Sequence, residues 1–383
     1  MKTFKTFLLP LFLLFTTLLA ACGGGGGAGG GYSGGTGTSN TSQMGGSIQG
    51  KALALSTQVT TLAGTAGSSG FTNGTGAAAL FHDPRGIATD GTNLYVADGS
   101  NNTLRKVVIA TGVVTTLAGA AGSSGSADGT GAAALFSDPT GVTTDGTHLY
   151  VTEQTAHTIR KVVIATGVVT TLAGTAGSSG SVDGTGAAAR FSQPTGITTD
   201  GTNVYVMDSA NNTIRKLVIA TGAVTTLAGT AGSSGSVDGT GAAARFNESI
   251  GITTDGTSLY VVDYGNSTIR KVVIATGAVT TLAGTAGSSG SADGTGAAAR
   301  FHEPMEITTD GANLYVADRY NQAVRKVVIA TGVVTTLAGT AGSGGSTDGT
   351  GAEARFKNPV GITTDGTNLY VTDQGNQTIR KIQ

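Results

Sequence analysis

Histidine and acidic side chains are the residues here that could do chemistry, because the sequence has four histidines and a single cysteine. His82, His302 and Glu303 are of the types that bind Zn²⁺, and each lies one or two residues before a proline. Glu303 and Glu306 are a carboxylate pair of the kind used in acid–base catalysis. No nucleophile–base arrangement or phosphate loop accompanies them. We therefore assign no catalytic residue and predict no cofactor, and a divalent metal ion at His82, His302 or Glu303 stays open as an alternative.

A long internal repeat must position these residues. The motif VTTLAG begins at Val59 and returns every 55 residues, at Val114, Val169, Val224, Val279 and Val334. Each unit contains four strand-like segments, which in the first unit are residues 86–90, 93–98, 103–111 and 112–119. The turn sequences Asp-Gly-Thr, Gly-Ser-Asn-Asn and Ala-Thr-Gly lie at their junctions. Such short turns force antiparallel neighbours, so each unit is predicted to be a four-stranded meander, and tandem meanders predict a β-propeller.

The chain ends indicate a closed ring. Residues 57–64 form the last strand of a unit that has no preceding unit, and residues 378–383 end a unit that lacks its last strand. In a ring, each end supplies what the other lacks, and no sheet edge is left exposed. We therefore predict an all-β, six-bladed β-propeller of four-stranded antiparallel blades, in which residues 57–64 complete the blade of residues 361–381.

The repeated residues resemble a known family. The pattern P-x-G-I-x-x-D-G-T-N-L-Y-V-A-D-x-x-N-x-T-I-R-K, followed by G-x-V-T-T-L-A-G, resembles the NHL repeat across residues 57–383. The resemblance implies a six-bladed propeller used mainly for binding. Related propellers also include lyases and lactonases, so a propeller enzyme with a metal at the channel mouth is the alternative. Four residues depart from the pattern: Glu153, Ala156, Ser249 and Glu306.

Variation among the six copies is concentrated on one face of the predicted ring. The Asp-Gly-Thr and Ala-Thr-Gly turns, which share a face that we call the constant face, are nearly identical in all copies. The turns between second and third strands share the opposite face with the long connections between blades. We call it the variable face, because its turns differ in every copy: residues 99–102, 154–157, 209–212, 264–267, 319–322 and 374–377. We interpret the variable face as the one adapted to a ligand.

The candidate binding residues follow from this interpretation. The residue after each proline position forms a ring at the channel mouth, with Arg85 in the first blade and apolar Ile250 and Met305 in the fourth and fifth. Glu306 replaces a glycine and is predicted to project a carboxylate towards the axis. The turns of these two blades add Tyr and Arg, the residues that most often contribute binding energy at interfaces. The predicted binding set is Ile250, Tyr264, Met305, Glu306, Arg319, Tyr320 and Arg85.

The residues that hardly vary have a structural interpretation. Asp98 and Asn101 are expected to fix the tight turn through bonds to nearby backbone, and Arg105 lies across the hairpin within ion-pair reach of Asp98. The Asp-Gly-Thr turns are likewise interpreted as turn chemistry, because they lack the ligand spacing of a calcium loop.

The N-terminal region predicts export and lipid attachment. Residues 1–21 combine Lys2 and Lys5 with a short apolar run, as in a signal peptide, and Leu-Ala-Ala-Cys resembles a bacterial lipobox that ends at Cys22. Residues 22–56 are rich in Gly and Ser and are predicted to be a flexible tether carrying the acylated cysteine. Gly23 resembles the outer-membrane sorting signal. The expected location is the cell envelope, anchored in the outer membrane and facing the periplasm or the cell surface.

Composition restricts the partners. The chain has 64 glycines, no tryptophan, 12% charged residues and a net charge of −1. Such a chain has no basic field that could hold a nucleic-acid backbone. The predicted partners are the membrane, through the lipid at Cys22, and a protein or other envelope ligand on the variable face.

Overall fold

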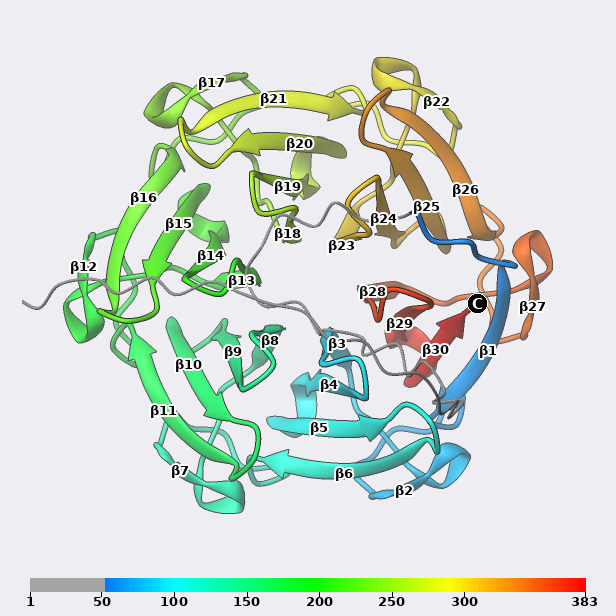
Figure 1. The fold of residues 1–383 in the computed structure, drawn as a ribbon, viewed down its shortest axis with the longest axis horizontal. Coiled ribbons are helices and arrows are strands. Elements are labelled where there is room, and N and C mark those ends of the chain that lie inside the picture. Colours follow the sequence, from blue (N-terminus) through cyan, green and yellow to red (C-terminus); the bar gives the residue numbers. More distant parts are fainter. Residues whose placement is uncertain (1–51) are drawn as a thin grey trace, which may run out of the picture. The chain divides into compact units, whose positions relative to one another are not determined.

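Six β-sheets surround a central channel in the computed structural model, which describes residues 52–383 (Figure 1). The first blade contains β3 (Pro84–Thr89), β4 (Asn93–Asp98), β5 (Thr103–Val108) and β6 (Val113–Ala118), counted outwards from the channel, and β2 (Gly74–Thr75) pairs with β6 at the rim. The predicted six-bladed propeller is confirmed. The prediction of four strands per blade is wrong in number, because a Gly-Thr pair from each long connection adds a fifth short strand.

The next four blades repeat this order. The second blade contains β7 (Gly129–Thr130), β8 (Pro139–Thr144), β9 (His148–Glu153), β10 (Thr158–Val163) and β11 (Val168–Ala173). The third contains β12 (Gly184–Thr185), β13 (Pro194–Thr199), β14 (Asn203–Asp208), β15 (Thr213–Val218) and β16 (Ala223–Gly229). The fourth contains β17 (Gly239–Thr240), β18 (Ile252–Thr254), β19 (Ser258–Asp263), β20 (Thr268–Val273) and β21 (Ala278–Ala283). The fifth contains β22 (Gly294–Thr295), β23 (Pro304–Thr309), β24 (Asn313–Asp318), β25 (Ala323–Val328) and β26 (Val333–Gly339).

The sixth blade is built from both ends of the described chain. It contains β28 (Pro359–Thr364), β29 (Leu369–Asp373), β30 (Thr378–Ile382), β1 (Gln58–Ala63) and β27 (Gly349–Thr350), in that order from the channel. The N-terminal β1 pairs antiparallel with β30, with Val59 opposite Ile382. Val59 and Ala63 are fully buried, so β1 also supplies core side chains. The predicted closure of the ring is therefore confirmed.

Short 3₁₀ helices complete the connections. Six lie in the long connections between blades, at Gly76–Ala78, Gly131–Ala133, Gly186–Ala188, Gly241–Ala243, Gly296–Ala298 and Gly351–Glu353. Four lie in the variable-face turns, at Gly99–Asn101, Ser209–Asn211, Tyr264–Asn266 and Gln374–Asn376. Each 3₁₀ helix of the long connections is followed by a phenylalanine, and Phe81 and its five equivalents are completely buried. Within residues 52–383, no helix is long and apolar enough to span a membrane.

The hydrophobic core is divided among the gaps between blades. Tyr95 and Leu104 of the first blade pack in one cluster with Phe136 and Leu149 of the second. Equivalent clusters recur around the ring, because the strands carry apolar residues on both sheet faces and each blade is covered by its two neighbours. Leu53 and Leu55, at the end of the predicted tether, also pack against the cluster between the fifth and sixth blades. The packed part of the chain therefore begins before Thr57.

A buried polar cluster holds each hairpin of second and third strands. The Asp98 carboxylate accepts hydrogen bonds from Arg105 and Asn101, both at 2.8 Å, and from the His82 backbone N–H at 2.7 Å. The Arg105 guanidinium also lies 5.2 Å from the centre of the Phe81 ring. In the second blade, Glu153 replaces the aspartate and reaches both Arg160 and the Thr158 hydroxyl. The longer side chain thus compensates for Ala156, which cannot donate as asparagine does.

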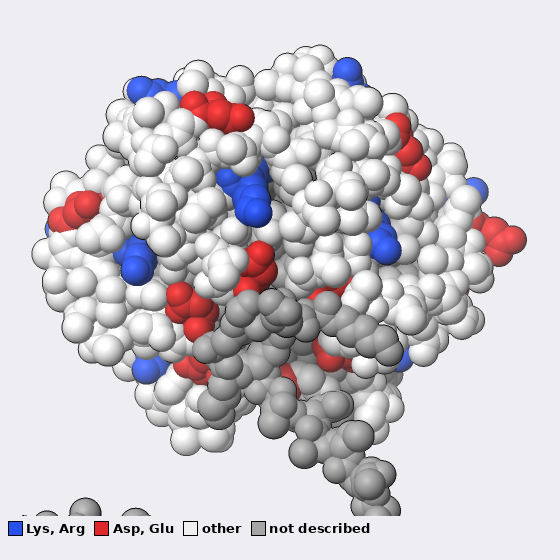
Figure 2. Space-filling model, turned by 45° about the horizontal axis from the view of Figure 1, so that its top comes forward, with Lys and Arg blue, Asp and Glu red and all other residues white. Residues whose placement is uncertain are grey.

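The constant-face turns have the predicted turn chemistry. Asp90 accepts hydrogen bonds from the backbone N–H groups of Thr92 and Asn93, and the Tyr95 hydroxyl donates to its second carboxylate oxygen at 2.7 Å. The surrounding surface has few charges. Figure 2 shows Lys, Arg, Asp and Glu as isolated groups on a mostly uncharged face. The described residues therefore present no basic field on this face.

Candidate functional site

The variable-face turns of the fourth and fifth blades bring aromatic, acidic and basic side chains together. The Tyr264 hydroxyl donates a hydrogen bond to the Glu303 carboxylate of the next blade. Desolvation and this hydrogen bond both raise the pKa of Tyr264 above its ordinary value. The His302 and Tyr320 rings lie 5.2 Å apart, and the Arg319 guanidinium lies 5.3 Å from the Tyr320 ring centre. We call Tyr264, His302, Glu303, Arg319 and Tyr320 the aromatic patch.

Two members of the aromatic patch remain available for a ligand. The Tyr320 side chain is 42% exposed, which is high for a large aromatic residue in this ring. The Arg319 guanidinium lies over the Tyr320 ring, 5.3 Å from its centre. The aromatic patch thus offers an apolar ring beside a cationic donor, a combination common at binding surfaces.

Arg85 occupies the channel mouth in the first blade but is already paired. Its guanidinium forms ion pairs with Asp83 and with Asp138 of the second blade, both at 2.8 Å. These contacts tie two neighbouring blades together. Arg85 is therefore a clamp between blades, and any contact with a ligand would compete with two carboxylates.

The channel narrows where the inner strands begin, and glycine is required there in five blades. A Cβ on Gly196 would lie 2.0 Å from the Ile250 carbonyl oxygen, and one on Gly86 would lie 2.4 Å from that of Thr140. Such contacts are sterically forbidden, so neighbouring inner strands approach this closely only without side chains. Glu306 is the exception, because it carries a side chain at the level of these glycines.

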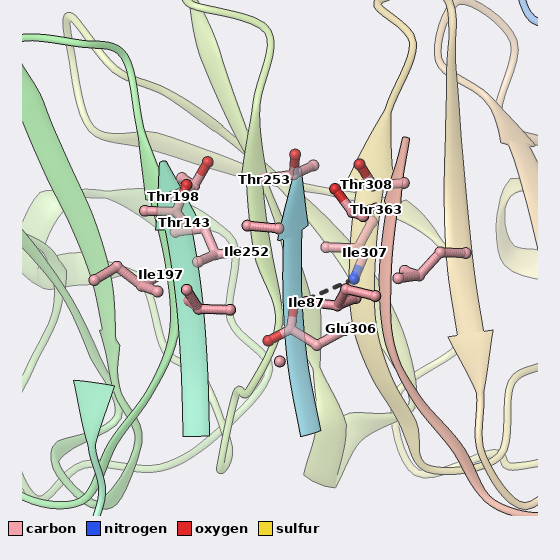
Figure 3. Close-up of a pocket in the computed structure, with 14 residues that line it drawn as sticks. Ile87, Thr143, Ile197, Thr198, Ile252, Thr253, Glu306, Ile307, Thr308 and Thr363 are labelled. Atoms are coloured by element: carbon pink, nitrogen blue, oxygen red, sulfur yellow. Dashed lines mark hydrogen bonds between the residues drawn. The ribbon is translucent and has the colours of Figure 1, made fainter. Parts of the chain in front are cut away.

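The Glu306 carboxyl group lies inside the channel. The cavity has a volume of about 100 Å³ and is lined by all six inner strands. Figure 3 shows the Glu306 side chain directed into it, below a belt of isoleucines and a ring of threonine hydroxyls. Burial raises its pKa from 4.5 to about 8, although the backbone N–H groups of Ile307 and Ile252 act in the opposite direction. The sequence-based placement of Glu306 towards the axis agrees with this geometry.

The structure brings together only part of the predicted set. Tyr264, Arg319 and Tyr320 form the aromatic patch with His302 and Glu303, while Ile250 and Met305 are half-buried where the inner strands begin. Within residues 52–383, no three His, Cys, Asp or Glu side chains are placed to hold a metal ion, so His82 does not join His302 and Glu303 in a metal-binding cluster. Cys22 lies outside the described residues.

Sequence reasoning missed two features of the site. It did not pair Tyr264 with Glu303, although both lie on the variable face. It also missed the threonines that line the channel, which the sequence marks only by the repeated Ile-Thr-Thr or Val-Thr-Thr of the inner strands: Thr143, Thr198, Thr253, Thr308 and Thr363.

Comparisons with known proteins identify the repeat. No family model matches the chain. The chain is 30% identical over 282 residues to Protein SUPPRESSOR OF QUENCHING 1, chloroplastic, of Arabidopsis thaliana, a match covering 69% of this chain and 26% of that protein. It is 27% identical over 305 residues to NHL repeat-containing protein 2 of Gallus gallus, covering 70% of this chain and 42% of that protein. The chain thus spans less than half the length of these relatives.

Solved structures share the fold. A Bacteroides thetaiotaomicron protein matches with a TM-score of 0.65 and 23% identity, over 85% of this chain and 75% of that one. An auxiliary nutrient binding protein of the same species matches with a TM-score of 0.64 and 18% identity, over 85% and 76%. A gluconolactonase of Xanthomonas campestris matches with a TM-score of 0.52 and 12% identity, over 79% and 86%. At these identities the likeness concerns the fold alone.

The fold and the site define a six-bladed β-propeller with a cavity in its central channel and one varied face. Its 55-residue unit is the NHL repeat, as the NHL repeat-containing relatives show. The chain is an NHL-repeat β-propeller.

Proposed function

We propose that this chain is a binding protein of the cell envelope, anchored by a lipid on Cys22, and that it takes a protein or other envelope ligand on its variable face. The observation that carries the proposal is the aromatic patch. It combines the exposed Tyr320 ring with the Arg319 guanidinium, which lies 5.3 Å from the centre of that ring. The similarity in fold to an auxiliary nutrient binding protein supports a binding role.

The contrast between the two faces supports the same proposal. Constant-face carboxylates such as Asp90 and Asp145 accept hydrogen bonds from backbone N–H groups of their own turns and from a tyrosine hydroxyl. The variable-face side chains of the fourth and fifth blades instead contact one another across blades. Polar side chains of the constant face thus bond within single turns, while those of the variable face in the fourth and fifth blades meet across the blade boundary.

The alternative is an NHL-like lyase or lactonase with a metal at the channel mouth. Propellers described as a gluconolactonase and as a virginiamycin B lyase share the fold, with TM-scores of 0.52 and 0.50. A catalytic metal ion commonly needs about three protein ligands. Residues 52–383 offer no such set, so binding is favoured over metal-assisted catalysis.

The experiment begins with capture of a ligand from envelope extract on the purified full chain. The captured molecule is identified and purified, and its affinity is measured for wild type, Arg319→Ala, Tyr320→Ala and the constant-face control Thr202→Ala. We expect the two patch variants to bind at least about tenfold more weakly, as truncation of an interface anchor usually costs 1–2 kcal/mol or more. The control should bind as wild type does. Equal affinities for all four proteins would refute the proposal, as would equal losses on both faces.

A further inference from the structure

The central channel contains a second candidate site, separate from the aromatic patch. Its cavity of about 100 Å³ is larger than the space one water molecule needs, roughly 10–15 Å³. Its middle is a belt of Ile and Val side chains contributed by all six blades, and threonines line the end towards the constant face (Figure 3). The cavity therefore has room for a few non-hydrogen atoms, with apolar walls and polar groups at its ends.

Glu306 is the acidic group of this cavity. Its carboxylate lies beside Gly251 of the fourth blade, where a Cβ would approach Oε2 to 3.0 Å. The Ile307 backbone N–H is 3.4 Å from the same oxygen. Because the other five blades have glycine at this position, the ring itself does not require a carboxylate here. The fold accommodates Glu306 without using it in an ion pair.

No cation of the inner strands compensates this carboxylate. Glu306 and Arg85 are the two charged residues on β3, β8, β13, β18, β23 and β28. Arg85 is already bound to Asp83 and Asp138, and no His, Lys or Arg lines the cavity. A desolvated carboxylate without a cation is costly, and it is stabilised either by taking up a proton or by binding a cation.

The lining favours an organic cation over a metal ion. Calcium takes six to eight oxygen ligands, often several carboxylates, and magnesium requires near-octahedral oxygen coordination. This cavity offers one carboxylate and an apolar belt. Apolar walls with a few placed polar groups are typical of sites for small organic molecules.

We propose that the channel binds a small primary alkylammonium group, with Glu306 as its anionic partner and the Ile and Val belt around its alkyl chain. The ammonium group donates hydrogen bonds to the carboxylate, and the alkyl chain lies along the channel towards the threonine hydroxyls. Glu306 is half-buried, so part of its side chain is accessible to an incoming ligand although its carboxylate is largely desolvated. The same chemistry is present in a free amine and in a lysine side chain of a partner. The site is independent of the proposed ligand at the aromatic patch.

The test uses n-butylammonium as the probe and the purified full chain. Binding is measured by calorimetry at about pH 9 and about pH 6, since the alkylammonium stays charged at both, as lysine does with a pKa of about 10.4. We expect saturable binding at the higher pH and at least about tenfold weaker binding at the lower, because the protonated carboxyl cannot pair with a cation. Two competitors are then added in excess. Lysine amide with a free side-chain amine should displace the probe, whereas lysine amide acetylated on its amino groups should not.

Two variants distinguish a loss of probe binding from a loss of folding. Glu306→Gln preserves shape and hydrogen bonding, and Glu306→Gly restores the residue of the other five blades. Both should keep the ring folded, by circular dichroism, and lose probe binding, while Thr202→Ala should retain it. Binding that persists in Glu306→Gln would overturn the proposal. So would absence of binding at about pH 9, or equal displacement by sodium or calcium ions. Tyr320→Ala should lose the ligand of the aromatic patch but keep n-butylammonium binding in the channel. Each proposal can therefore be refuted without refuting the other.

Discussion

Replacing Glu306 by glutamine should change how the stability of the ring depends on pH. Burial in the channel raises the pKa of Glu306 from 4.5 to about 8. A carboxyl group with a raised folded-state pKa stabilises the fold while it is protonated, and this contribution is lost as pH rises. Between about pH 4.5 and 8 the unfolded chain has released the proton and the folded chain has kept it. The free energy of unfolding should therefore fall by roughly 1.4 kcal/mol per pH unit, to a total of at most about 5 kcal/mol.

The assay is urea unfolding of wild type and Glu306→Gln at each pH unit from about 5 to 9. The difference between the two proteins removes the contributions of all other titrating groups. Relative to the glutamine variant, wild type should lose stability up to about pH 8 and then level off. Glu353→Gln, which removes the same charge from an exposed 3₁₀ helix, is the matched control. A flat or rising difference for Glu306→Gln would refute the burial of an unpaired carboxyl in the channel.

Three further predictions concern the scaffold and the anchor. Deleting residues 57–64 should lower the unfolding midpoint of the whole ring and promote self-association, because β30 would lose its partner β1. A deletion variant that melts as wild type does and sediments as a monomer would contradict the closure. Asp208→Asn should lower the free energy of unfolding in urea by about 3–5 kcal/mol, because it weakens the buried partner of the Arg215 guanidinium. Asp183→Asn, which changes the half-exposed partner of the same arginine, should lower it by less than about 1 kcal/mol. Similar costs for both would contradict this division. Cys22→Ser should move the protein from the membrane to the soluble fraction without lowering its melting temperature; membrane retention would count against the lipid anchor.

Much of the fold could be predicted because the same strand and turn sequences recur at a constant spacing of 55 residues. The hairpins, the closure by β1 and the buried Asp98–Arg105 pair all follow from residues whose spacing is fixed. The fifth strand of each blade could not be predicted, since Gly74 and Thr75 lie in a Gly/Ser-rich connection and glycine is disfavoured in strands. Its pairing is imposed by the neighbouring β6 and not by local preference.

The site was harder to predict than the fold because its contacts join different blades. Glu306 could be placed near the axis, since it replaces a glycine in one of six equivalent positions. Its raised pKa depends on what surrounds it in three dimensions, namely an apolar belt without a free cation. The bond from Tyr264 to Glu303 joins residues 39 apart, each of which varies among the copies, so no repeated pattern marks it.

Hydrogen–deuterium exchange on the full chain with its captured ligand shows which face of the ring the ligand covers. We expect slower exchange on binding in residues 263–268 and 318–323, which carry Tyr264, Arg319 and Tyr320 of the aromatic patch, with little change in the Asp-Gly-Thr turns at Asp90, Asp145 and Asp200. Protection confined to those constant-face turns, with residues 263–268 and 318–323 unchanged, would contradict it.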